Sequence, residues 1–196
     1  MGYTYAPTPA YRSLMIFIDG GYLRKNVRDL VGNDNINFCA FSNWLGGSPK
    51  KGSGRIEPDL IRIYYYDAIV DRSDPNYEKQ DKYFDNIQKE ELYEVRLGRL
   101  IKTDKDYRQK GVDILLAIDM LSKAFLHHFE WCILLAGDDD YVDLVKMIKN
   151  STGKQVLGAY FEHNASERLK NSFDSRISLN KELLIKYNCV RDTKDD

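Results

Sequence analysis

The sequence has few cysteines, and none of them are closely spaced. The three cysteines, Cys39, Cys132 and Cys189, are widely separated along the 196 residues. Disulfide frameworks and cysteine-based zinc sites need closely spaced cysteines. The spacing therefore argues against both and is compatible with a reducing cytosol.

Long apolar runs are also missing. No stretch approaches the roughly 18 consecutive apolar residues that a membrane-spanning helix needs. The first dozen residues have neither the basic start nor the apolar stretch of a signal peptide. These absences predict a soluble, cytoplasmic protein with no membrane partner, and they leave a homo-oligomer open.

An excess of charge of either sign is absent as well. The 29 basic and 30 acidic residues nearly cancel, so the chain lacks the global positive field of a strongly basic nucleic-acid binder. Any nucleic-acid site must therefore be local. The length fits one domain with a substantial core.

The chain is expected to form one domain between two polar tails. Residues 1–12 and 189–196 lack apolar periodicity and are predicted to be mobile tails around a domain of residues 13–188. A Gly- and Ser-rich stretch with Lys50 and Lys51 makes residues 42–58 a predicted flexible basic loop. For these two lysines, a role in solubility is favoured over phosphate binding.

Short apolar runs alternate with helical patterns. Five β-branched or aromatic runs predict buried strands: residues 14–18, 60–66, 93–97, 132–135 and 155–160. Helices are predicted over residues 76–92, over 112–125, and in the stretch after Asp140 that Gly153 ends. Strands that alternate with helices indicate an α/β fold with a parallel sheet covered on both faces.

Carboxylates follow two of the predicted strands. The first strand runs into Asp19, Gly20 and Gly21, and the strand at residues 132–135 is followed by three aspartates, Asp138 to Asp140. Ligands of an open parallel sheet bind outside the carboxyl ends of its strands, so we expect these residues to line a site. The glycines would let the backbone approach a ligand closely.

The three adjacent aspartates have two interpretations. A helix cap explains one of them, because Asp is a favoured N-cap and stabilises the first turn of a helix. Three neighbouring carboxylates at a partly buried strand end repel one another unless a cation neutralises them. Since oxygen ligands suit magnesium and manganese, a Mg²⁺ or Mn²⁺ site is the favoured interpretation.

A predicted helix supplies further acids. It is apolar nearly all round, which indicates burial, yet Asp113 and Asp119 interrupt it, and an unpaired buried carboxylate is costly. Asp113 lies at the helix start, where capping and metal binding are equally supported. Asp119 points about 240° round the helix axis from Asp113. It is therefore expected to pair with a lysine or arginine, or to support the site from outside.

A basic segment lies between the third strand and this helix. Arg99, Lys102, Tyr107, Arg108 and Lys110 interleave cations with one aromatic ring. This composition suits phosphate contact and base stacking by a bound nucleic acid. A solvated charged loop is an equally supported interpretation.

Four phrases of the sequence resemble one family. FIDGGYLRKNV, RIYYYDA, QKGVDILLAIDM and LLAGDDDYVDLVKMIKNSTGKQV are similar to the NYN domain of the LabA/DUF88 group, which is related to the PIN-like nucleases. The resemblance runs in order from about Leu14 to Asn180. It implies a three-layer α/β/α sandwich with a central parallel sheet of about five strands, PIN-like and Rossmann-like. It also implies a ribonuclease that depends on Mg²⁺ or Mn²⁺ and acts on single-stranded or structured RNA.

The resemblance implies roles for individual acids. Four of them are expected to bind metal and to act in cleavage of phosphodiester bonds: Asp19 from the first strand, Asp113 from the helix, and Asp138 and Asp140 from a Gly-Asp-x-Asp-aromatic motif. Asp119 and Asp139 are secondary candidates. The residues expected to contact the substrate are Gly20, Gly21, Arg99, Lys102, Tyr107, Arg108 and Lys110.

The sequence departs from the family pattern at one point. Many NYN domains have an asparagine shortly after the first aspartate, whereas Gly21 and Tyr22 occupy that region here. The metal or water contact of that asparagine is therefore missing or supplied elsewhere.

Three other hypotheses use the same residues differently. The missing asparagine and the near-neutral charge also suit a non-catalytic RNA- or protein-binding module of the same fold. Residues 138–140 also resemble the Asp-x-Asp that holds manganese in glycosyltransferases, which need no acid at Asp19 or Asp113. A receiver-type phosphorylation domain is disfavoured, because the third strand runs into Leu97, Gly98 and Arg99 rather than into an aspartate.

Overall fold

A mixed seven-stranded sheet forms the centre of the protein. The computed structural model describes residues 10–48, 56–103 and 107–190. In these residues the strand order is β4-β3-β2-β1-β5-β6-β7, and every neighbouring pair is parallel except β3 with β4. The strands are β1 (Ala10–Asp19), β2 (Ile56–Ile69), β3 (Tyr93–Lys102), β4 (Tyr107–Lys110), β5 (Trp131–Leu135), β6 (Gln155–Phe161) and β7 (Ser175–Leu179).

The five predicted strands are present as β1, β2, β3, β5 and β6. The predicted sheet of about five strands, all parallel, is wrong in the number of strands and in their directions. The two missed strands, β4 and β7, form the edges of the sheet. All four residues of β4 are exposed and only one of the five in β7 is buried. Neither strand therefore has the continuous apolar run that marks a strand covered on both faces.

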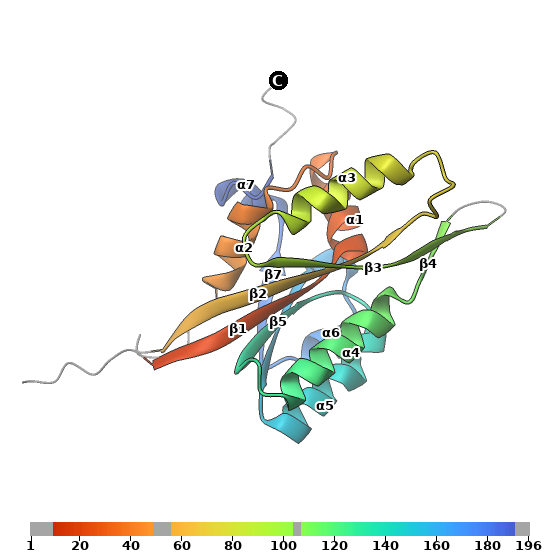
Figure 1. Cartoon of the computed structure of the whole chain (residues 1–196). Helices are drawn as coiled ribbons and strands as arrows, with labels where there is room; N and C mark the ends of the chain where they lie inside the picture. The colour runs from red at the N-terminus through yellow and green to blue at the C-terminus, as the bar shows by residue number, and fades with distance from the viewer. Residues whose placement is uncertain (1–9, 49–55, 104–106, 191–196) are drawn as a thin grey trace, which may run out of the picture.

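Helices cover both faces of the sheet (Figure 1). On one face lie α1 (Gly20–Val31), α2 (Phe38–Gly46), α3 (Tyr77–Gln88) and α7 (Lys181–Lys186), and on the other α4 (Val112–Phe125), α5 (Val142–Thr152) and α6 (Glu167–Ser172). Alternate residues of β1 serve the two cores: Leu14, Ile16 and Ile18 pack on the α1 side, and Met15 and Phe17 on the α4 side. None of the helices in the described ranges has the length and apolar character needed to cross a bilayer.

Helix α2 extends into the segment predicted to be a loop. Residues 42–46 lie in α2, and Leu45 is buried in the core. The loop prediction is therefore wrong for these residues, because a short apolar helix precedes the glycine-rich stretch. Lys50 and Lys51 lie outside the described residues.

Ordered structure also reaches into both predicted tails. Strand β1 begins at Ala10. At the other end, Cys189 and Val190 are buried, and Val190 forms an isolated β-bridge with Ile36. Residues 1–9 and 191–196 lie outside the described part of the chain.

The order of the strands reverses beside β1. From β1 the chain moves outward through β2, β3 and β4, and then crosses to the other side of β1 to form β5, β6 and β7. Connections that leave in opposite directions open a crevice at the carboxyl ends of the strands. Ile18 pairs with Leu135, and Asp19 with Tyr66. Asp19 and the residues that follow Leu135 therefore meet at this edge.

Gly158 offers a test of the packing between β6 and the α4 side of the core. A Cβ on this residue would lie 2.0–2.5 Å from three ring atoms of Phe173. Gly158→Ala is expected to overpack the core and to destabilise the fold by about 1–3 kcal/mol. For a chain of this size that lowers the Tm by roughly 2–4 °C per kcal/mol, which thermal unfolding by circular dichroism measures.

The double variant Gly158→Ala/Phe173→Leu is the control, because the smaller side chain makes room for the added methyl group. It should recover part of the lost Tm. A Gly158→Ala protein as stable as the wild type would contradict the packing described for Phe173.

Candidate functional site

Two of the predicted acids cap helical segments at the switch point. Asp19, the last residue of β1, accepts a 2.9 Å hydrogen bond through Oδ1 from the backbone N–H of Tyr22 and caps α1. Asp138, which follows β5, accepts a 3.1 Å hydrogen bond through Oδ1 from the N–H of Asp140. Capping is therefore confirmed for Asp138. Each cap uses only Oδ1, and neither Oδ2 accepts a hydrogen bond from the described residues.

The first turn of α4 brings a third acid to the same edge. Helix α4 leads into β5 and returns across the sheet, so its N-terminus lies at the carboxyl ends of the strands (Figure 1). Asp113 is exposed there, and its Oδ1 accepts a 2.8 Å hydrogen bond from the hydroxyl of Tyr141. Burial, together with the charges of Asp19 and Asp113, raises the pKa of the Tyr141 hydroxyl far above its usual range. Tyr141 therefore remains a proton donor to Asp113.

Burial and neighbouring acids raise the pKa of Asp19. The pKa moves from 3.8 to about 7, mainly because the carboxylate is removed from water. The hydrogen bond from the Tyr22 N–H lowers the pKa, whereas the charges of Asp113, Asp67 and Asp138 raise it further. These acids are close enough to repel Asp19. In the described residues no lysine, arginine or histidine forms an ion pair with Asp19.

We call Asp19, Asp113 and Asp138 the acidic cluster. Within the part of the chain that the structure describes, no three His, Cys, Asp or Glu side chains are grouped so that they could hold a metal ion. The type of donor nevertheless fits a hard divalent cation, because Asp19, Asp113 and Asp138 offer carboxylate oxygens and a cation would relieve their repulsion. Binding of such an ion would require these side chains to move closer together.

The remaining aspartates after β5 differ from each other. Asp139 forms an ion pair with Arg168 and accepts a hydrogen bond from the hydroxyl of Ser166, so residues at the start of α6 neutralise it. Asp140 is exposed and has no ion-pair partner in the described ranges. It is not among the main charges that raise the pKa of Asp19, which places Asp140 at the rim of the cluster.

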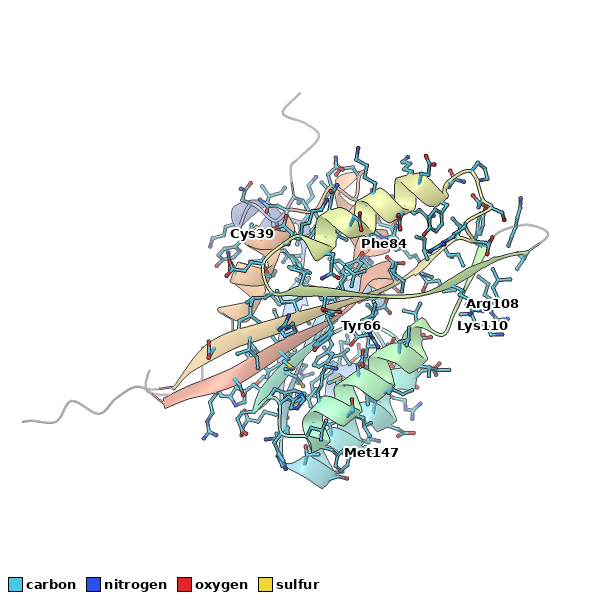
Figure 2. The ribbon with its side chains drawn as sticks, viewed as in Figure 1. Cys39, Tyr66, Phe84, Arg108, Lys110 and Met147 are labelled. Atoms are coloured by element: carbon cyan, nitrogen blue, oxygen red, sulfur yellow. The ribbon has the colours of Figure 1, made fainter. Side chains whose placement is uncertain are left out.

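Asp119 lies away from this cluster and is paired with cations. Its Oδ2 accepts hydrogen bonds from the Tyr66 hydroxyl at 3.2 Å and from Arg96 Nε at 3.1 Å, and Lys123 Nζ lies 3.4 Å from Oδ1. The expected pairing with a lysine or arginine is confirmed, with one of each. Figure 2 shows Tyr66 between the sheet and α4. Asp119 thus holds α4 to β2 and β3.

A further acid at this edge, Asp67, is not among the predicted residues. It lies near the end of β2, is fully buried, and binds Arg24 of α1 through both oxygens, each at 2.9 Å from a guanidinium nitrogen. Burial raises the pKa of Asp67, and Arg24 opposes that rise. Asp67 follows the apolar run at residues 60–66 directly, so the rule that selects Asp19 from the sequence also selects Asp67.

The two glycines after Asp19 are packed against protein. A Cβ on Gly20 would lie 2.4 Å from the Tyr65 ring, and one on Gly21 would lie 2.7 Å from Nε2 of Gln109. Gln109, from β4, therefore covers the start of α1, and its Nε2 also lies 3.4 Å from Oδ1 of Asp67. The close approach that both glycines allow is to side chains of this chain, and a contact of theirs with substrate stays a prediction.

Tyr22 occupies the region of the expected asparagine and is directed to β6. Its hydroxyl accepts a 3.0 Å hydrogen bond from the N–H of Phe161, and a Cβ on Gly137 would lie 2.3 Å from its ring. Asn26, one turn further along α1, is buried and bonded to the Tyr22 carbonyl and to Asn164. Both side chains are therefore engaged within the protein, and Gln109 is the amide side chain found beside Asp67.

The predicted basic segment forms a β-hairpin, apart from residues 104–106, which the structure does not describe. Strands β3 and β4 pair with Arg99 opposite Lys110 and Lys102 opposite Tyr107. Since β3 is parallel to β2 and β1, the hairpin extends past the carboxyl edge, and Figure 2 shows Arg108 and Lys110 near the start of α4.

The hairpin presents its cations to solvent. Its four basic residues, Arg99, Lys102, Arg108 and Lys110, are all exposed. The hydroxyl of Tyr107 donates a 2.8 Å hydrogen bond to Asp74, which ties the hairpin to the turn between β2 and α3. The hairpin is therefore an anchored, positively charged arm beside the acidic cluster.

Two comparisons with known proteins give a match, and one does not. A model of the NYN domain family matches residues 13–180. No curated protein matches the chain significantly. A solved structure of a protein of unknown function from Vibrio parahaemolyticus is similar, with a TM-score of 0.62 and 17% identity over 87% of this chain and 94% of that chain. At that identity the likeness shows a shared fold alone.

Asp19→Asn is expected to change stability in a pH-dependent way. Because the pKa of Asp19 is raised to about 7, its contribution to stability is fully present below about pH 4, the pKa of an unfolded aspartate, and is lost as the pH rises through about 7. In EDTA, the Tm of Asp19→Asn relative to the wild type should therefore increase by several degrees from pH 5 to pH 8. Thermal unfolding over this pH series measures the change.

The matched control for this series is Asp143→Asn, which removes an exposed carboxylate in the first turn of α5. Its Tm should stay close to that of the wild type, because a substitution at an exposed surface position changes stability little. A constant difference between Asp19→Asn and the wild type at all pH values would show that Asp19 titrates normally.

Asp119→Ala is expected to destabilise the fold without affecting the cluster. The substitution leaves Tyr66, Arg96 and Lys123 without their common partner, and loss of such a network costs about 1–3 kcal/mol. Urea unfolding should show the loss, and Asp119→Asn should lose less because its amide oxygen still accepts a hydrogen bond. Equal stability of Asp119→Ala and the wild type would contradict the role of Asp119 in holding α4 to β2 and β3.

Proposed function

The chain belongs to the NYN domain family, and we propose that it is a metal-dependent ribonuclease whose active site is the acidic edge at Asp19, Asp113 and Asp138. Membership of the LabA/DUF88 group and a cytoplasmic location are part of the same proposal.

One observation carries this proposal: the fold neutralises some acids at the edge and leaves others unpaired. Arg24 neutralises Asp67, and Arg168 neutralises Asp139. In the described residues the three proposed metal ligands have no cationic partner. Clustered acids without a cation raise the pKa of a partly buried carboxylate, and carboxylates with perturbed pKa values cluster at functional sites.

Mg²⁺ or Mn²⁺ would be held by Asp19, Asp113 and Asp138, with Asp140 at the rim to place a second ion or a water molecule. Such ions, when bound, activate a water molecule and stabilise the leaving oxygen of a phosphodiester. Carboxylate oxygens are ligands that both ions accept.

The chain's own residues would prepare the site for this ion. Tyr141 fixes Oδ1 of Asp113 by its hydrogen bond, which leaves Oδ2 for the edge. The caps at Asp19 and Asp138 likewise hold each Oδ1. The pairing of Asp67 with Arg24 limits the negative charge at the edge. These contacts hold one oxygen of each carboxylate, and the binding of an ion would bring the free oxygens closer together.

The basic hairpin would hold the RNA beside the acids. Arg99, Lys102, Arg108 and Lys110 are suited to phosphate oxygens. The ring of Tyr107 offers a surface on which a base could stack. The backbone at Gly20 and Gly21 would lie close to the phosphate that is cut.

The other hypotheses differ in their support. A non-catalytic RNA- or protein-binding module of the same fold stays open, because Tyr22 stands where many NYN domains have an asparagine. The match to the NYN family does not support a glycosyltransferase.

Cleavage of RNA in the presence of Mn²⁺ tests the proposal. The wild type should cut both a single-stranded and a structured RNA in Mn²⁺ and neither in EDTA, with products resolved on denaturing gels. Asp19→Asn and Asp138→Asn should each lower the rate by about 100-fold or more, since loss of a preorganised charged group at the reacting centre has that order of effect. Asp143→Asn should cut at the wild-type rate.

Metal binding supplies a second readout that does not depend on turnover. Mn²⁺ should raise the Tm of the wild type at pH 8 and leave that of Asp19→Asn unchanged. RNA binding without cleavage, together with no Mn²⁺ effect on Tm, would favour the non-catalytic module.

A further inference from the structure

A polar pocket lies between α1 and α3, outside the acidic cluster. It has a volume of about 460 Å³. Its lining includes Arg24 and Arg28 from α1, Lys79, Gln80 and Tyr83 from α3, and Asn35 from the segment before α2. We call it the α1–α3 pocket.

Arg24 connects the α1–α3 pocket to the acidic edge. Its guanidinium group lines the pocket and also binds both oxygens of Asp67. The charge of Asp67 in turn acts on Asp19. One side of the pocket is therefore formed by a residue whose ion-pair partner belongs to the acidic edge.

The charge of the lining favours an anion. Three cations, Arg24, Arg28 and Lys79, line the pocket with one acid, Asp34. Since Asp67 already neutralises Arg24, the excess positive charge comes from Arg28 and Lys79. Asp34 pairs with Arg28 at 2.5 Å on the surface, where such a pair is weak. Lys79 is exposed and forms no ion pair in the described residues. It is the cation most available to a ligand.

A neighbouring pocket lacks the positive charge of the α1–α3 pocket. The second pocket, of about 500 Å³, shares Asp34, Asn35 and Tyr83 with the first. Its described lining adds Glu90 and contains no lysine or arginine. A phosphate is therefore expected in the α1–α3 pocket and not in its neighbour.

The remaining side chains suit a nucleotide. Tyr83 forms an aromatic wall, with the guanidinium of Arg24 5.7 Å from the centre of its ring. Gln80 accepts a 3.1 Å hydrogen bond from the N–H of Val70 through Oε1, which orients its amide and leaves Nε2 as a donor. Cations beside an aromatic ring and an amide donor are what proteins use to hold a phosphate and its base.

We infer that the α1–α3 pocket binds a backbone phosphate of a single-stranded RNA whose neighbouring phosphodiester lies at the acidic edge. The inference rests on the proposed function and adds the form of the substrate. A pocket of this volume takes a group of small-ligand size. A flexible single strand can place one nucleotide in it, whereas the stacked, paired nucleotides of a duplex cannot enter.

Binding of a short RNA to a protein that does not cut tests this inference. In the Asp19→Asn background, the Kd for a fluorescein-labelled single-stranded RNA of about a dozen nucleotides is measured by anisotropy in EDTA. Lys79→Glu should raise the Kd by about 5–10-fold and lower the slope of log Kd against log salt by about 0.7, the value for one phosphate contact on a single strand. Lys79→Arg should bind like the parent.

Lys82→Glu is the matched control. It makes the same charge change at another exposed residue of α3 that does not line the pocket. Its charge lies one helical turn from Lys79, so it should raise the Kd by about 2-fold through the local field and leave the slope of log Kd against log salt unchanged, because it makes no phosphate contact. Asp34→Asn should tighten binding, since it frees Arg28 from its ion pair. Equal losses for Lys79→Glu and Lys82→Glu, or no loss for either, would overturn the inference.

The outcomes separate this inference from the proposed function. If the wild type cuts RNA in Mn²⁺ and the Lys79→Glu variant binds and cuts RNA equally well, the ribonuclease proposal stands and RNA binding by the pocket is refuted. If the wild type does not cut RNA but its Kd for RNA depends far more strongly on Lys79 than on Lys82, RNA binding by the pocket stands and the ribonuclease proposal is refuted. Equal affinity for the same RNA as a duplex overturns the preference for a single strand.

Discussion

Negative charge that the fold does not neutralise is the constraint around which this end of the molecule is organised. Parallel pairing of β1 with β2 and β5 places Asp19 and Asp138 at one edge, and the return of the chain through α4 adds Asp113. Each carboxylate is held by one hydrogen bond from a neighbouring backbone N–H or hydroxyl group. None of these donors carries a full positive charge, so the acids are oriented without being neutralised. Burial raises the pKa of Asp19, and the charges of these unneutralised acids raise it further.

The cations of the protein are distributed in a complementary way. Arg24 pairs with the buried Asp67 beside the cluster, and Arg96 pairs with Asp119, which lies away from it. Other cations lie on the hairpin of β3 and β4 and in the α1–α3 pocket. A chain with a net charge of −1 can therefore present a negative centre with positive flanks. That pattern suits a polyanion whose backbone is held at two places while a metal ion occupies the centre.

Tyr22 lies in the region where many NYN domains have an asparagine, and it links the start of α1 to the end of β6. The tyrosine hydroxyl is bound to the end of β6, and its ring packs over Gly137. The start of α1 is thereby fixed to the strand two places away from β1. The amide of Gln109 reaches the same region from β4, a strand at the edge of the sheet. The hairpin therefore contributes an amide side chain beside Asp67 as well as its exposed cations.

The sequence by itself determined the elements that are buried on both faces, because such elements need continuous apolar runs that are visible locally. Five strands and the positions of Asp19 and Asp138 after their strands follow from this pattern. The sequence also predicts the limits of α4 at residues 112 and 125, but the expected burial all round this helix is wrong, because Ile114, Ile118 and Phe125 are exposed. The orientation of Asp119 away from Asp113 follows from helix geometry alone. Tertiary structure decided which acids are neutralised, since Arg24 and Asp67, or Asp139 and Arg168, are brought together from distant parts of the chain. Tertiary structure also determined that β4 and β7 form strands at the edges of the sheet. Their mostly exposed residues give no apolar run in the sequence, and their hydrogen bonds form only with a neighbouring strand.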